Sequence, residues 1–240
     1  MQASFPDEFA LVAACCRWPP TAEVVADVQR LAASALDWRL VQCIAERHRV
    51  VGLVHHALHS ADVPCPEHVR ATLARTSTAI ARQNLALAME TLRLQRHFDG
   101  LGIPFVALKG ASLAQRAYGT TAFKHGRDID LLVSPSHAFA ALRLLEADGY
   151  GLVDPARALT DAQRHAYIAR GYQMELCDAR RGTRVELHWR LSENPHLLAG
   201  IDPFADGQWV PLAGGALRTL NAADLFAYLC VHGANHSGFA

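Results

Sequence analysis

The sequence shows no excess of charge of either sign. Its 240 residues include 23 lysines and arginines and 23 aspartates and glutamates, so the formal net charge at pH 7 is zero. Proteins that hold nucleic acid usually present a broad basic surface, because the phosphate backbone is a polyanion. The balance leaves room for a local basic patch but argues against nucleic acid as a partner.

Long apolar runs are also missing. No segment offers the roughly eighteen uninterrupted apolar residues that a membrane-spanning helix requires, and the first twenty residues lack a basic leader followed by an apolar stretch. The six cysteines form no Cys-x-x-Cys pair, which fits buried reduced thiols better than a zinc site or a disulfide framework. We expect a soluble cytoplasmic protein with no membrane partner.

The chain changes character near residue 100. Up to Phe98, alanine, leucine and valine recur at the three- and four-residue spacing that is typical of helices, whereas short apolar strands alternate with helices beyond it. The pattern predicts an α+β protein with a helical N-terminal region at 1–99 and a second domain at 100–240. The predicted helices cover 21–36, 37–60, 66–98, 111–118, 136–149 and 221–236, and the predicted strands cover 105–108, 128–134, 172–179 and 183–191.

A glycine stands where the first predicted strand turns into a helix. Without a side chain, Gly110 lets backbone amides approach a ligand closely, and the amides at the start of the next helix favour an anion. Lys109 and Ser112 flank the turn and can add a cation and a hydroxyl, as phosphate recognition often requires. The alternative is that Gly110 only permits a tight turn and Lys109 is solvated.

Two acidic residues lie one position apart on the next predicted strand. Because side chains alternate along a strand, Asp128 and Asp130 project on one face while Ile129 projects towards the core. Carboxylates this close repel one another unless a cation neutralises them, and hard oxygen ligands suit Mg²⁺ or Mn²⁺. The alternative is an edge strand with a solvated outer face.

A third acidic residue lies on a later strand. The alternation in 183–191 places Glu186 on the same face as Arg184 and His188, away from the core. If this strand lies beside the first, three carboxylates converge and can hold divalent ions that neutralise a phosphoryl group. The alternative is a solvated hairpin in which His188 is an ordinary half-buried histidine.

These motifs together resemble a known superfamily. Glycine at a strand-to-helix turn, then Asp-x-Asp, then a single later acid is similar to the nucleotidyltransferases that share the DNA polymerase beta fold. The order LKG, DIDLLV, ELHW resembles more closely an uncharacterised bacterial nucleotidyltransferase family. The resemblance implies a mixed sheet with flanking helices and a Mg²⁺ or Mn²⁺ cofactor. It implies that Gly110 and Ser112 face the triphosphate, that Asp128 and Asp130 bind the metals, and that Glu186 is the third catalytic and metal-binding carboxylate.

The chain departs from this pattern in two places. Relatives usually carry arginine four residues before the first aspartate, where this chain has Lys124, which keeps the charge but loses bidentate phosphate recognition. Together with Lys109 and Arg127, Lys124 is expected to receive the triphosphate. The resemblance also implies more helix after Ala240, so we expect the C-terminal region to be truncated or short.

The expected function is transfer of a nucleoside monophosphate from an NTP, ATP among them, to a hydroxyl of an unidentified small molecule, peptide or protein, with release of pyrophosphate. The alternative is a non-catalytic nucleotide-binding or antitoxin-like interaction protein that keeps the fold. The intact set of three acids favours the enzyme.

Overall fold

The computed structural model describes residues 5–155 and 159–237. Within these residues, no helix is both long enough and apolar enough to cross a membrane. The chain forms two compact units: unit 1 comprises the residues up to Ala86 together with Arg116–Gly126, and unit 2 comprises Leu87–Gln115 and the residues from Arg127 onward. The domain division inferred from the sequence, between residues 99 and 100, stays a prediction.

Unit 1 is helical, as the spacing of its apolar residues predicts. The Thr21 hydroxyl and the Asp37 carboxylate cap two of its helices by accepting hydrogen bonds from the first backbone amides. The single helix predicted over 37–60 is instead two helices, because Arg49 takes a φ of +58° between them. Its helices are α1 (Asp7–Cys15), α2 (Ala22–Ala32), α3 (Trp38–Arg47), α4 (Val51–Ser60) and the first part of α5 (Glu67–Gly100).

A buried asparagine organises the loop that precedes the acidic strand. The Asn84 side-chain amide donates to the carbonyl oxygens of Thr121 and Lys124 at 2.7 and 2.5 Å. Its oxygen accepts from the amide of Gly126 at 2.9 Å. Asn84 therefore uses both sides of its amide to hold a loop that has no regular secondary structure.

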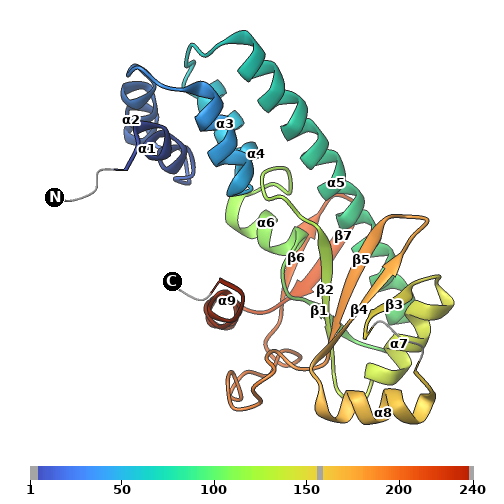
Figure 1. Ribbon diagram of the computed structural model, residues 1–240. Coiled ribbons are helices and arrows are strands. Elements are labelled where there is room, and N and C mark those ends of the chain that lie inside the picture. Colours follow the sequence, from blue (N-terminus) through green and yellow to red (C-terminus); the bar gives the residue numbers. More distant parts are fainter. Residues whose placement is uncertain (1–4, 156–158, 238–240) are drawn as a thin grey trace. The chain divides into compact units, whose positions relative to one another are not determined.

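Unit 2 contains a mixed five-stranded sheet in the order β1-β2-β5-β4-β3, which confirms the predicted α+β class (Figure 1). Strands β2 and β5 are parallel, and the other neighbours are antiparallel. The strands are β1 (Phe105–Ala107), β2 (Asp128–Val133), β3 (Gly151–Asp154), β4 (Gln173–Asp178) and β5 (Thr183–His188), and β6 (Gln208–Leu212) pairs with β7 (Gly215–Thr219) in a second sheet. The complete helices after α5 are α6 (Ala111–Tyr118), α7 (Ala138–Ala147), α8 (Asp161–Arg170) and α9 (Ala222–Ser237).

The two faces of the five-stranded sheet carry different cores. On one face, Ile129 and Leu131 of β2 pack with Phe98 of α5 and Leu142 of α7. On the other face, Leu132 packs with apolar residues of α9. Because Asp130 alternates with the first pair, it lies on the α9 face. The core of that face is formed by Val106, Leu108, Leu132, Leu220, Leu225 and Tyr228.

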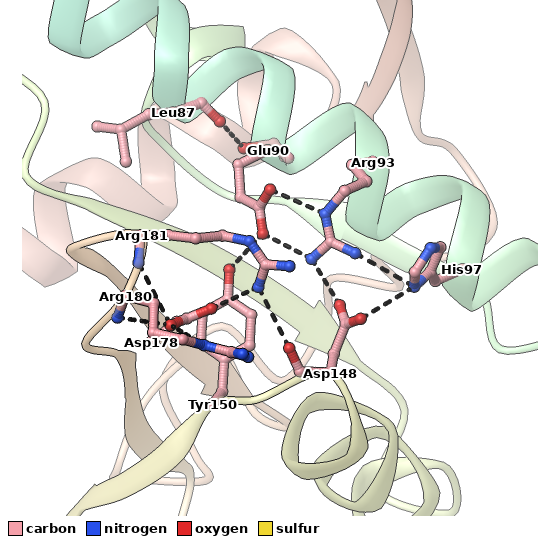
Figure 2. Close-up of polar contacts among 10 residues, drawn as sticks. Leu87, Glu90, Arg93, His97, Asp148, Tyr150, Asp178, Arg180 and Arg181 are labelled. Carbon is pink, nitrogen blue, oxygen red and sulfur yellow. Dashed lines mark hydrogen bonds and ion pairs between the residues drawn. The ribbon is translucent and has the colours of Figure 1, made fainter.

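A polar network in unit 2 ties the second half of α5 to the turn between α7 and β3 (Figure 2). Arg93 donates to Glu90 at 2.6 Å and to Asp148 at 2.5 Å, and the Tyr150 hydroxyl donates to Glu90 at 2.6 Å. The hydrogen bonds from Arg93 hold the pKa of Glu90 below its ordinary value, although burial opposes the shift. Arg181 of the β4–β5 hairpin joins the network by donating to the Asp148 carbonyl at 3.2 Å.

Candidate active site

Parallel strands β2 and β5 bring two acidic side chains together. Asp130 is paired with Glu186 in their register, so both carboxylates project on the α9 face of the sheet. Strand β2 also has β1 on its other side, so it is an interior strand and not a solvated edge, the alternative that the sequence left open. The fold thus joins two acidic motifs that are more than fifty residues apart in the chain.

Asp130 is buried, and a lysine balances its charge. Its side chain is only 1% exposed, and Nζ of Lys109 lies 2.7 Å from its Oδ1 atom. Burial alone would raise the pKa of Asp130, but the His188 imidazole and the Lys109 ammonium hold that pKa well below its ordinary value. The alternation along the strand places Asp130 away from the core side of Ile129, and the fold nevertheless buries it, with its carboxylate charged.

His188 lies beside both carboxylates. Its Nε2 atom is 3.4 Å from Oε2 of Glu186 and 3.6 Å from Oδ1 of Asp130, and its side chain is 4% exposed. Neither ring nitrogen has a partner with hydrogen-bond geometry among the described residues. Burial would lower the pKa of His188, but the two carboxylates raise it above its ordinary value. The alternation pattern alone is compatible with a half-buried histidine, and the fold buries His188 against the acids.

These three side chains fit a divalent cation. One ligand atom from each of Asp130, Glu186 and His188 lies within 4.8 Å of the others. Two ligands about 2.1 Å from a shared ion and at right angles lie about 3 Å apart, so small side-chain shifts suffice. The nitrogens of His188 are buried without hydrogen-bond partners among the described residues, and a metal ion at one of them would supply such a partner.

Asp128 is separated from this group. It is half-buried at the start of β2, and in the parallel register it pairs with Arg184 rather than with another acid. The pKa of Arg184 is raised, chiefly by its hydrogen bond to Glu175 on β4, with the charge of Asp128 adding to the effect. The roles of Asp128 as a metal ligand and a catalytic residue therefore stay predictions.

Gly110, at the turn between β1 and α6, has the left-handed backbone conformation that glycine adopts most easily. Gly110 has a φ of +65°, and α6 begins at the next residue. A Cβ atom at Gly110 would meet only the Asp128 carbonyl, at 3.9 Å, among the described atoms, so the approach to this backbone is open. Ser112 is fully buried, and its hydroxyl donates to the Lys109 carbonyl at 3.0 Å. That bond fixes the turn, and phosphate binding by Gly110 and Ser112 stays a prediction.

The three expected phosphate-binding cations occupy different environments. Lys109 is mostly buried beside Asp130, whereas Arg127 is exposed directly before β2. Lys124 belongs to unit 1, where its carbonyl oxygen accepts from Asn84. Lys109 and Lys124 are the two lysines of the chain, and the other cations of this class are arginines. Binding of the triphosphate by Lys109, Lys124 and Arg127 stays a prediction.

A pocket of about 490 Å³ lies beside the group of three. His188 forms part of its wall, and Tyr228 and His232 line it from α9. His232 also reaches the site directly, because its Nε2 atom lies 3.1 Å from Nζ of Lys109. The burial of Tyr228 raises its pKa, and the charges of Asp130 and Glu186 add to the shift. The remaining lining residues are Tyr172, Gln173, Leu191, Ser192, Glu193, Asn194, Leu197 and Val231.

The α9 contributions could not be found from the sequence. Tyr228 and His232 lie about a hundred residues after Asp130, and no motif connects them to it. His188 did carry a signal, because it shares a strand face with Glu186 two residues earlier.

Comparison with known proteins identifies a family. The model of a family described as "Uncharacterised nucleotidyltransferase" matches residues 34–239, which is most of the chain. No curated protein and no solved structure matches the chain.

Proposed function

The chain belongs to the uncharacterised nucleotidyltransferase family, and we propose that it transfers a nucleoside monophosphate from an NTP to a hydroxyl group of an acceptor. The observation that carries the proposal is the parallel pairing of β2 with β5, which sets Asp130 beside Glu186. The buried charge of Asp130 and the unsatisfied nitrogens of His188 are costly to the fold, and such groups concentrate at functional sites.

The proposed NTP site starts at the Gly110 turn. The open backbone there and the first amides of α6 suit the triphosphate, because they provide donors without a side chain in the way. Lys109 supplies an ammonium beside Asp130, and Arg127 supplies a guanidinium directly before β2. Lys124 is proposed to complete the set of cations.

Asp128, Asp130 and Glu186 are proposed to hold Mg²⁺ or Mn²⁺, with Asp130 and Glu186 in the group that fits an ion. When bound, the ion supplies charge neutralisation at the reacting phosphate. In the transfer, the acceptor oxygen forms a bond to the α-phosphorus, while the bond from that phosphorus to the bridging oxygen breaks. Pyrophosphate leaves with the bonding electrons. Glu186, 25% exposed, is proposed to take the proton from the acceptor hydroxyl.

The pocket beside His188 is the proposed place for the acceptor or the nucleoside. It adjoins the carboxylates through His188, and its wall combines aromatic, amide and hydroxyl groups. Such a wall is typical of small-molecule sites, in which apolar contacts bind and a few polar groups orient.

Thermal unfolding with nucleotides tests the binding step. Each of the four NTPs is added with Mg²⁺, with Mn²⁺, or with neither, and the melting temperature is measured. At least one NTP should raise it, and a divalent ion should enlarge the increase, because a ligand that binds the folded state stabilises it. No increase with any NTP under any condition would contradict the proposed function. Stabilisation without pyrophosphate release would instead favour a non-catalytic nucleotide-binding protein.

A further inference from the structure

We infer that His188 is a direct nitrogen ligand of the metal in this site, and that the site therefore prefers Mn²⁺ to Mg²⁺. The inference rests on the metal requirement of the proposed function, but it concerns which atoms bind the ion and which ion they select. It adds an imidazole to a site for which the sequence indicates carboxylates alone.

The position of His188 carries the first step. His188 shares a strand face with Glu186, and the β2–β5 pairing directs both towards Asp130. Its Nε2 atom lies 3.4 and 3.6 Å from the two carboxylates. These distances are close to the separation of about 3 Å expected for neighbouring ligands of one ion.

The missing hydrogen bonds carry the second step. A buried imidazole normally donates from one nitrogen and accepts at the other, and leaving both unsatisfied is costly. At His188, both nitrogens are buried without a hydrogen-bond partner among the described residues. A metal ion at Nε2 would satisfy one of them and would share Oδ1 of Asp130 with the Lys109 ammonium.

The competing explanation is that His188 is only a cation that separates two carboxylates. Asp130, however, also has the Lys109 ammonium 2.7 Å away, so one counter-charge remains when His188 is uncharged. An ion at Nε2 would displace the proton that the carboxylates favour there, and the neutral imidazole would then be the ligand. The two explanations differ in whether nitrogen contacts the ion, and this difference can be measured.

The ligand set determines the preference between ions. Mg²⁺ takes oxygen ligands and demands near-ideal octahedral geometry, whereas imidazole suits first-row transition ions. Mn²⁺ accepts carboxylates and tolerates an imidazole, so one nitrogen among oxygen ligands favours it over Mg²⁺. We expect Mn²⁺ to bind more tightly than Mg²⁺, and replacement of His188 to remove most of the difference in affinity.

Pulsed electron paramagnetic resonance on the full chain with Mn²⁺ alone tests the inference without turnover. The wild-type protein should show echo modulation from a directly bound ¹⁴N nucleus, and labelling the histidines with ¹⁵N should change its frequency. The modulation should disappear in His188→Gln and persist in His232→Gln, which removes the other described imidazole of the pocket. His196→Gln is the matched control, because His196 is exposed and outside both the group and the pocket wall.

If His188→Gln does not fold, the spectra of the ¹⁵N-labelled wild type and of His232→Gln still test whether His188 binds the ion. A ¹⁵N-sensitive signal that persists in His232→Gln supports His188. Absence of nitrogen modulation in Mn²⁺-loaded wild type, or its loss in His232→Gln alone, overturns the inference. Failure to bind Mn²⁺ overturns it as well. Mn²⁺ bound without nitrogen, together with NTP-dependent stabilisation, would overturn this inference and leave the proposed function standing.

Discussion

The Nζ atom of Lys109 lies 2.7 Å from the Oδ1 atom of Asp130, in a place where both side chains are largely withdrawn from water. The ammonium thus sits where a divalent cation would contact the same carboxylate. In the metal-free protein, the Lys109 ammonium already neutralises Asp130. A metal ion that binds Asp130 must therefore displace part of the contact between Asp130 and Lys109. Its neighbour His232, 3.1 Å from the ammonium, offers it an alternative polar partner.

Lys109→Gln should destabilise the metal-free protein and increase its response to metal. Removing one partner of a buried ion pair costs about 3 kcal/mol, because the remaining charge loses its compensation. Mn²⁺ should restore that loss, so the melting temperature of the variant should rise more with Mn²⁺ than that of wild type. Lys124→Gln, the other lysine of the chain, is the matched control. An equal metal response in wild type and Lys109→Gln would show that the ammonium and the ion do not share Asp130.

Asp130→Asn should abolish metal binding and lower the stability of the metal-free protein. The acidic motif viewed alone suggests that neutralising one carboxylate relieves repulsion. The structure reverses this expectation, because Asp130→Asn would take from the mostly buried Lys109 ammonium the carboxylate that balances it, while His188 would keep only Glu186. The free energy of unfolding and the Mn²⁺ affinity measure the two effects. Asp128→Asn is the comparison: it should retain Mn²⁺ binding in the absence of nucleotide, since Asp128 lies outside the group. A more stable Asp130→Asn would contradict the ion-pair account.

Much of this site follows from alternation along two strands. The period of two is sufficient to place Asp128 with Asp130 on one face of the first strand, and Glu186 with His188 on one face of the other. Side chains of the two strands lie close together only because β2 and β5 pair in parallel. This pairing joins strands that are far apart in the sequence, and local sequence patterns do not specify it. The burial of Asp130 likewise depends on Lys109 and α9, which come from other parts of the fold.

The elements that the sequence pattern missed have weak local signals. Strand β3 is short, partly exposed and irregular in its register with β4, and β6 contains Pro211 and an exposed Trp209. Helix α8 has no buried residue among its ten, so it shows little of the apolar periodicity that identifies a helix. Such elements form because neighbouring strands and helices support them.

Gly110→Ala should lower both stability and NTP affinity. A φ of +65° costs a residue with a Cβ atom about 1 kcal/mol, whatever the space around it. Gly182, in the β4–β5 hairpin, has a φ of +64° and open space among the described atoms, so Gly182→Ala carries the same strain away from the Gly110 turn. Both variants should lose similar stability in denaturant unfolding, and only Gly110→Ala should weaken NTP binding. Equal NTP affinity in the two would place the triphosphate elsewhere.

Glu90→Gln should flatten the acid side of the stability profile. Because the pKa of Glu90 is lowered in the folded protein, its stabilisation is present above the ordinary value of 4.5 and is lost as the pH falls through the folded value. At neutral pH the variant should lose about 2 kcal/mol, since hydrogen bonds to charged groups are the strong ones. Unfolding in denaturant from pH 7 to pH 3 measures both effects.

Glu67→Gln provides the control for this network. Glu67 pairs with Arg70 on the same helix at the same three-residue spacing as Glu90 with Arg93, but both members of the Glu67 pair are exposed. Its replacement should cost about 0.5 kcal/mol or less. Equal losses in the two variants would mean that the bonds to Tyr150 and Asp148 add nothing to the Glu90–Arg93 pair.

The most direct test of nucleotidyl transfer follows the phosphorus atom itself. The protein is incubated with Mn²⁺ or Mg²⁺, a panel of hydroxyl-bearing acceptors and NTPs labelled with ³²P at the α or the γ position. Label from the α position should appear in an acceptor or in the protein, label from the γ position should leave in pyrophosphate, and both should vanish in Glu186→Gln. Release of inorganic phosphate alone, or equal behaviour of wild type and Glu186→Gln, would contradict the account.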